Sequence, residues 1–64
     1  MPKFMAVLHY THAENGEVTQ AIFDDDHQNL YDRVFDIVGD RRVEDYDFDV
    51  YQYHHGYYHI TDND

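Results

Sequence analysis

The stretch DDDHQNLYDRVFDIVG, residues 24–39, decides the fold class. Its three leading aspartates supply an N-cap and favourable negative charge at the positive end of a helix dipole. Its final residue, Gly39, suits the position that follows a helix. Between them, apolar residues recur with a helical period and form one stripe: Leu30, Val34, Ile37 and Val38. We therefore predict an amphipathic helix over residues 25–38 that covers one face of another element.

Residues 3–23, before this helix, are typical of a β-hairpin. Asn15-Gly16 favours a two-residue turn, because both residue types tolerate positive φ. With that turn Tyr10 faces Ala21, and one face collects Phe4, Ala6, Leu8, Tyr10, Ala21 and Phe23. The other face holds Met5, Val7, His9, Val18 and Ile22. Both faces are then partly apolar, which indicates a homodimer or partner on the second face; a shifted register or a bulge is the alternative.

Residues 43–61, after the helix, indicate a second hairpin. A three-residue loop, His54-His55-Gly56, is preferred to a two-residue turn because it keeps Val50 and Ile60 on one face. The face toward the helix then carries Phe48, Val50, Tyr58 and Ile60. The other face carries Asp47, Asp49, Tyr51, Tyr53, Tyr57 and His59. The predicted fold is α+β with the order ββαββ, one antiparallel sheet with a single helix packed on one face. It forms one domain over residues 1–64, with a frayed tail at 61–64.

Charge is the most informative feature of the composition. Among 64 residues, 14 are acidic and 4 are basic, for a formal net charge of -10, while aromatic residues make up 17% and favour a folded chain. Such a charge repels nucleic acid and anionic membranes and attracts basic protein surfaces. The chain has no cysteine, no long apolar run and no signal-peptide pattern. These features predict a cytoplasmic protein, in the host cytoplasm if it is viral.

Three aspartates alternate along the predicted strand: Asp45, Asp47 and Asp49. Alternate residues of a strand lie on one face about 6.6 Å apart. A solvated face would need only polar residues, and threonine is the better strand former. Since a nucleic-acid strand carries a charge about every 3.4 Å, the aspartates match roughly every second phosphate. Neighbouring tyrosines offer anchors for a partner, namely Tyr51, Tyr53 and Tyr57. Further acidic surface is expected from Asp24, Asp25, Asp26, Asp36, Asp40 and Glu44.

The pattern predicts a small acidic inhibitor that binds a nucleic-acid-handling protein, as a possible nucleic-acid mimic. Target classes are nucleases, CRISPR or restriction effectors, polymerases, repressors and ribonuclease toxins. Small phage anti-defence proteins, anti-CRISPR proteins among them, and antitoxins share this size and acidity. The alternatives are an assembly subunit or a metal- or pH-responsive module built on His54, His55 and His59. In the preferred hairpin His59 stands apart from the other two, so no metal and no cofactor is assigned. The domain is too small for an enclosed pocket and carries no catalytic motif, so an enzyme is not expected.

Overall fold

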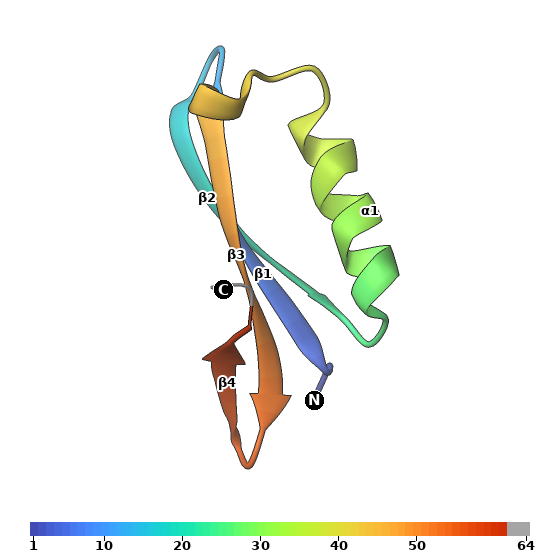
Figure 1. Ribbon diagram of the computed structural model, residues 1–64. Coiled ribbons are helices and arrows are strands. Elements are labelled where there is room, and N and C mark those ends of the chain that lie inside the picture. Colours follow the sequence, from blue (N-terminus) through green and yellow to red (C-terminus); the bar gives the residue numbers. More distant parts are fainter. Residues whose placement is uncertain (62–64) are drawn as a thin grey trace.

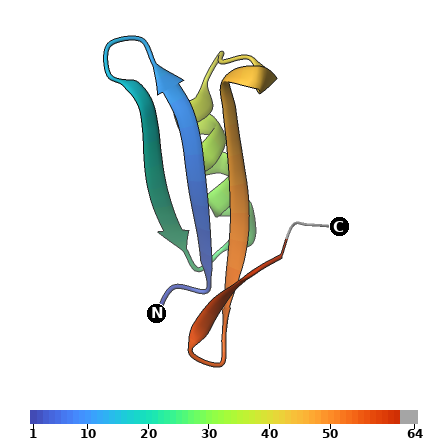
Figure 2. The same cartoon turned by 90° about the vertical axis from the view of Figure 1, so that its left-hand side faces the viewer.

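The computed structural model describes residues 1–61 as one antiparallel sheet with a single long helix. The elements in chain order are β1 (Phe4–His12), β2 (Gly16–Asp24), α1 (His27–Val38), the 3-10 helix η1 (Val43–Asp45), β3 (Tyr46–His54) and β4 (Tyr57–Ile60). Figure 1 labels the elements, and Figure 2 shows the strands side by side in the order β2-β1-β3-β4. The predicted α+β class and the ββαββ order are therefore confirmed.

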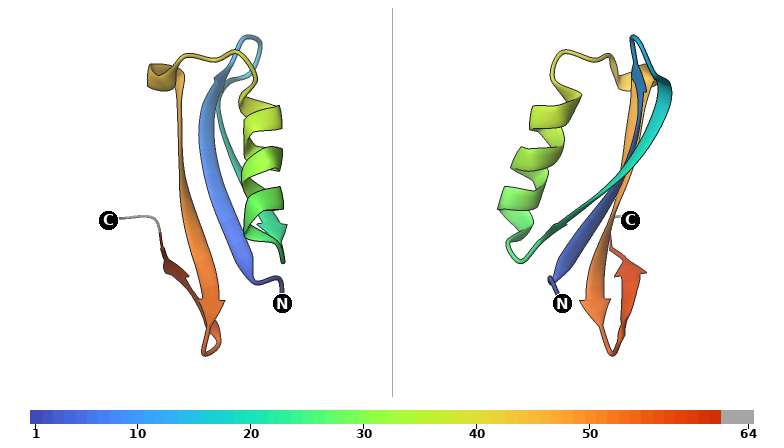
Figure 3. Two further views of the ribbon diagram at one scale, coloured as in Figure 1. Left: turned by 45° about the vertical axis from the view of Figure 1, so that its right-hand side comes forward. Right: turned by 180° about the vertical axis from the view of Figure 1, so that it is seen from behind.

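Helix α1 covers one face of the sheet, over β1 and β2, and leaves the opposite face uncovered within the described residues (Figures 2 and 3). The buried core lies between this helix and the strands. It consists of Ala6, Leu8, Ile22, Leu30, Val34, Val38 and Val50. We call the uncovered side the open face.

The ends of α1 follow from the capping residues. The Asp26 side chain accepts a hydrogen bond from the Gln28 N–H at 3.2 Å, so the helix begins at His27 rather than at residue 25. At the other end, the Gly39 N–H donates to the Phe35 carbonyl at 2.9 Å with a φ of +60°. The predicted N-cap within the aspartate run, here Asp26, and the predicted end of the helix at Gly39 are thus confirmed.

The register of the first hairpin differs from the prediction. Residues 13–15 form the loop, and Tyr10 faces Val18 rather than Ala21. The His12 Nδ1 accepts from the backbone N–H groups of Glu14 and Asn15, at 3.1 and 3.3 Å, and Gly16 takes a φ of +74°. These contacts favour a longer loop than Asn-Gly alone predicts. The shifted register, the alternative already considered, exchanges the faces of β2: Val18 and Ile22 face α1, whereas Ala21 and Phe23 face the open side.

The second hairpin also has a different register. His55 and Gly56 form a two-residue turn, with φ values of +52° and +88°, as in type I′ hairpins. Tyr53 therefore faces Tyr58. Tyr58 and Ile60 consequently lie on the open face, not beside Val50. The predicted three-residue loop was wrong because α1 lies over β1 and β2, so burial against the helix does not set the register of β4.

The described chain ends at Thr61. Its N–H and its hydroxyl both donate to the Val50 carbonyl oxygen, at 2.9 and 3.2 Å. The rest of the tail that we predicted to fray, residues 62–64, lies outside the described residues. No helix within residues 1–61 has the length and apolar character needed to cross a membrane.

Candidate functional site

Figure 2 shows the sheet from the open face, with α1 behind it. Residues that face each other on neighbouring strands form rows across this face. Toward the loop of the first hairpin, His9 of β1 lies between Thr19 of β2 and Asp47 of β3. In the next row Val7 lies between Ala21 and Asp49. This part of the open face is acidic and polar, and we call it the acidic half.

The remaining rows of the open face are aromatic and apolar. Met5 lies between Phe23 and Tyr51, and Tyr51 is followed by Ile60 of β4. Farther along, Tyr53 faces Tyr58. We call this set, namely Met5, Phe23, Tyr51, Tyr53, Tyr58 and Ile60, the aromatic half.

Ring contacts hold part of the aromatic half together. The Tyr58 ring lies 5.2 Å from the Tyr53 ring and 5.9 Å from the Phe23 ring, centroid to centroid. Although these three side chains come from different strands, they form one cluster. Phe23 remains 42% exposed and Ile60 remains 44% exposed. The aromatic half therefore offers both pre-arranged rings and exposed apolar surface.

The acidic half contains a shallow depression of about 280 Å³. Its lining includes His9, Thr19 and Asp47, with the carboxylates of Glu17, Glu44 and Asp45 also on its boundary. The His9 Nδ1 lies 3.0 Å from the Thr19 hydroxyl. Such a hollow suits a cationic side chain, because several carboxylates surround it and it is open to solvent.

Four of the predicted partner-binding residues share the open face: Asp47, Asp49, Tyr51 and Tyr53. Asp45 does not continue their line, because it belongs to η1 and β3 begins at Tyr46. Tyr57 lies on the opposite face, where it is 72% exposed. The prediction that all six residues share one face is therefore wrong for these two.

Sequence reasoning missed three contributors to the open face, namely Phe23, Tyr58 and Ile60. The last two follow from the two-residue turn His55-Gly56, which was the less preferred alternative to the three-residue loop in the sequence analysis. Phe23 lies on the open face because the first hairpin has the shifted register, which was only the alternative in the sequence analysis.

The predicted additional acidic surface is divided between several places. Asp24 has a side chain that is only 14% exposed, and it accepts from the Asp26 N–H at 2.9 Å and the Asn29 amide at 2.7 Å. The Asp26 N–H and, after it, Asn29 and Arg33 hold the pKa of the Asp24 carboxyl below its usual value, against an opposing effect of burial. Asp24 is therefore a structural residue that organises the start of α1.

The other members of this set remain exposed. Asp25 accepts from the Lys3 backbone N–H at 2.9 Å, and Asp26 caps the helix. Asp36 belongs to α1 and Asp40 follows it, so both lie on the helix side of the sheet. Glu44 lies in η1, beside the acidic half.

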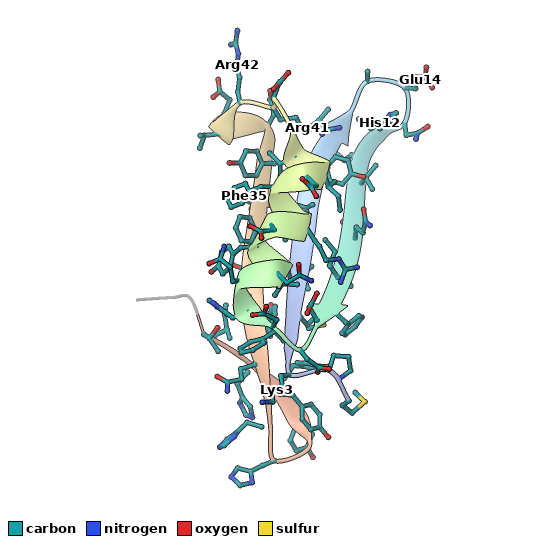
Figure 4. The ribbon with its side chains drawn as sticks, turned by 90° about the vertical axis from the view of Figure 1, so that its right-hand side faces the viewer. Lys3, His12, Glu14, Phe35, Arg41 and Arg42 are labelled. Atoms are coloured by element: carbon teal, nitrogen blue, oxygen red, sulfur yellow. The ribbon has the colours of Figure 1, made fainter. Side chains whose placement is uncertain are left out.

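None of the arginines, all of which lie within the described residues, pairs with Asp47 or Asp49. Arg33 donates to the Phe23 carbonyl at 2.7 Å and to Asp24 at 3.2 Å. Arg41 donates to the Thr11, Ile37 and Val38 carbonyls, and its guanidinium lies 4.6 Å from the Tyr10 ring centroid. Arg42 points outward and forms an exposed ion pair with Glu44 at 3.9 Å (Figure 4). Within residues 1–61, Asp47 and Asp49 form no ion pair. Their charge is therefore available to a partner.

The histidines of the second hairpin lie closer together than predicted. The His54 ring centroid is 4.1 Å from that of His55 and 6.4 Å from that of His59. His59 faces Gln52 rather than Tyr51, because of the two-residue turn. In the described part of the chain, no group of three or more His, Cys, Asp or Glu side chains is arranged to hold a metal ion.

Comparison with known protein families, with curated proteins and with solved structures gave no match. Function is therefore inferred from the open face itself, that is, from its charge, its exposed rings and its shape.

Proposed function

We propose that the chain is an inhibitory binding protein, and that its open face engages the basic surface with which a nucleic-acid-handling protein holds its substrate. The proposal rests on one observation above all. A sheet face with no cover from the described residues combines unpaired carboxylates with a cluster of aromatic rings. The target classes are those named from the sequence: nucleases, CRISPR or restriction effectors, polymerases, repressors and ribonuclease toxins.

Charge supports the choice of a basic partner. The net charge of -10 attracts a positively charged surface over several ångströms and accelerates the encounter. Asp47 lines the hollow that suits a lysine or arginine side chain, and Asp49 lies two residues farther along the same strand. Neither forms an ion pair within residues 1–61. Nucleic-acid channels are lined with such residues, because they neutralise phosphates.

The aromatic half supports specific binding rather than charge attraction alone. Tyrosine and phenylalanine bury large areas at low cost in side-chain entropy, and tyrosine is common at binding hot spots. Tyr53 and Tyr58 already contact each other in the free protein, at 5.2 Å between centroids. A partner therefore meets a partly ordered surface, which reduces the entropy lost on binding.

Imitation of nucleic acid is the mode of inhibition that we propose. Asp47 and Asp49 lie at alternate positions of β3, which places them about 6.6 Å apart. Asp45 extends the negative charge from η1 along an irregular path, whereas Glu44 is paired with Arg42. The mimic therefore presents charge density rather than a regular row of phosphates.

Affinity capture from lysate of the source cells tests this function. The bait is the wild-type protein, the Asp47→Lys/Asp49→Lys variant, or the matched control Asp36→Lys/Asp40→Lys. Both variants change the formal charge equally, but the control changes the helix side. We expect wild type and control to capture the same basic nucleic-acid-binding protein, and the open-face variant to lose it. Circular dichroism confirms that all three are folded.

Competition distinguishes mimicry from other inhibition. Duplex DNA, RNA or rising salt should displace the captured protein, because that protein uses the same basic surface to bind nucleic acid and the bait. A captured protein that is indifferent to nucleic acid and to the open-face variant would contradict the proposal. Light scattering of the free protein tests the other occupant considered for the open face, a second copy of the chain. A homodimer would double the measured mass, and its open face would already be covered.

A further inference from the structure

Within residues 1–61, the outer edge of β3 is only partly paired. Strand β4 pairs with β3 from Tyr51 to His54, and Thr61 reaches Val50. Among residues 1–61 no strand pairs with the outer edge of β3 between Tyr46 and Asp49. Figure 3 (left) shows β4 beside only one end of β3.

The direction of the backbone groups along this edge follows from two hydrogen bonds. The Tyr53 N–H donates toward β1, to the Lys3 carbonyl at 2.7 Å, whereas the Val50 carbonyl accepts from Thr61 on the opposite side. Successive residues of a strand alternate in direction. The N–H and C=O of Phe48 therefore point away from β1, to the outer edge, where another strand can bind them.

The side chains along this edge differ between its two sides. Asp47 and Asp49 project to the open face, while Phe48 projects to the helix side. Helix α1 lies mainly over β1 and β2. On the helix side of this part of β3, Phe35 of α1 contacts Phe48. The Phe35 ring is 49% exposed and lies 5.8 Å from the Phe48 ring (Figure 4).

These features select the chemistry of an added strand. Residues directly opposite each other in an antiparallel pair share a face, with their Cβ atoms about 5 Å apart. Basic residues are favoured opposite Asp47 and Asp49, and an apolar residue is favoured opposite Phe48. A second copy is disfavoured, because pairing two β3 edges would place aspartates against aspartates on molecules of charge -10.

We propose that the edge of β3 from Tyr46 to Asp49 receives an extended segment of the basic partner as an antiparallel strand, with basic and apolar residues in alternation. This inference rests on the proposed function, since it specifies how part of that partner binds. The outer edge of β2 is less suitable. Its open-face residues beyond Glu17 are Thr19, Ala21 and Phe23, so it lacks alternating carboxylates.

A capped synthetic peptide of alternating arginine and valine residues is the probe. In the proposed pairing, valine lies opposite Phe48 and directs its N–H toward β3, whereas the arginine N–H groups point outward. Methylation of the backbone nitrogens of the valines should therefore weaken binding about tenfold or more, since it removes the hydrogen bonds between the strands. Methylation of the backbone nitrogens of the arginines should leave the affinity within about twofold, and the charge of the peptide stays the same.

Amide hydrogen exchange followed by NMR provides the second measurement. Binding of the unmethylated peptide should slow exchange of the Phe48 N–H, with no change at Thr19 and Ala21 on the outer edge of β2. Asp47→Lys/Asp49→Lys should abolish this protection, and the helix-side control Asp36→Lys/Asp40→Lys should retain it.

Separate outcomes overturn the edge proposal and the proposed function. Equal affinity of all three peptides, or an unchanged exchange rate at Phe48, overturns the edge proposal. If affinity is lost only when the backbone nitrogens of the arginines are methylated, the antiparallel orientation is overturned. If the peptides bind equally but lose affinity to the Asp47→Lys/Asp49→Lys variant, the acidic open face still binds a basic ligand and only the added strand is refuted.

Discussion

The hydroxyl of Tyr58, in β4, donates a hydrogen bond of 2.8 Å to the carbonyl oxygen of Pro2, 56 positions earlier in the chain. The ring of the same tyrosine contacts Phe23 at the end of β2, with 5.9 Å between centroids. One side chain thus connects the last strand both to the residues before β1 and to the far side of the sheet. Tyr58 therefore couples the stability of the second hairpin to the aromatic half of the open face.

Tyr58→Phe should lower the Tm, because it removes the hydrogen bond to Pro2 and keeps the ring. Burial, followed by the influence of Tyr53 and Asp25, raises the pKa of Tyr58 above its ordinary value of 10.0. A raised pKa stabilises the fold below that ordinary value, and this contribution is lost as the pH rises through the folded-state pKa. The difference in Tm between wild type and variant should therefore shrink above about pH 10. Thermal melts monitored by circular dichroism measure it, and a difference that persists unchanged at high pH would contradict the assignment.

Asp24→Asn should destabilise the protein at neutral pH and have little effect in acid. The carboxylate accepts from the Asp26 N–H and from Asn29 and Arg33, and its pKa lies below the ordinary value of 3.8. Its contribution is present above that value and is lost as the pH falls through the lower folded-state pKa. Urea unfolding of both proteins at several pH values measures the difference. Asp36 is exposed and forms no ion pair within residues 1–61, so Asp36→Asn serves as the control for general charge effects.

His12→Leu should destabilise the first hairpin by about 1 kcal/mol, since two backbone N–H groups in the loop lose their acceptor. His12→Asn should restore part of the loss, because an asparagine side-chain oxygen accepts from the backbone two residues on. Urea unfolding gives the free energies, and NMR of the Glu14 and Asn15 amides locates the change. Equal stability of the leucine and asparagine variants would show that the ring acts by packing instead.

His55→Asn should stabilise the protein by about 0.5 kcal/mol. His55 has a φ of +52°, in the left-handed region that asparagine adopts more readily than most residues. Gly56→Ala should destabilise by about 1 kcal/mol or more, because Gly56 has a φ of +88°. Thermal melts of the two variants give opposite shifts if the turn has two residues. A neutral Gly56→Ala variant would argue for a different loop.

Local signals in the sequence determined the class of fold. The helix period of Leu30 and Val34, the Asp26 cap and Gly39 are set by neighbours within a few residues, so they are visible without tertiary structure. The same holds for the alternation of Asp47 and Asp49 around Phe48, which places four predicted residues on the open face. The strand order β2-β1-β3-β4 was not predictable in this way, because it depends on which strands meet across the sheet.

The two registers, and with them the composition of the open face, were decided by loop contacts and by the position of α1, which the residue pattern did not show. A shift of one residue moves every side chain of a strand to the other face, so small differences in loop length have large effects. In the first hairpin, the His12 ring accepts two loop N–H groups and selects the longer loop. In the second, helix α1 does not extend over β4, so turn geometry outweighs the pairing of Val50 with Ile60. The sequence by itself determined the elements and the acidic strand. The packing of α1 over β1 and β2, which leaves β4 uncovered and its register to the turn, was decided only in the tertiary structure and placed Tyr58 and Ile60 beside Phe23 on that surface.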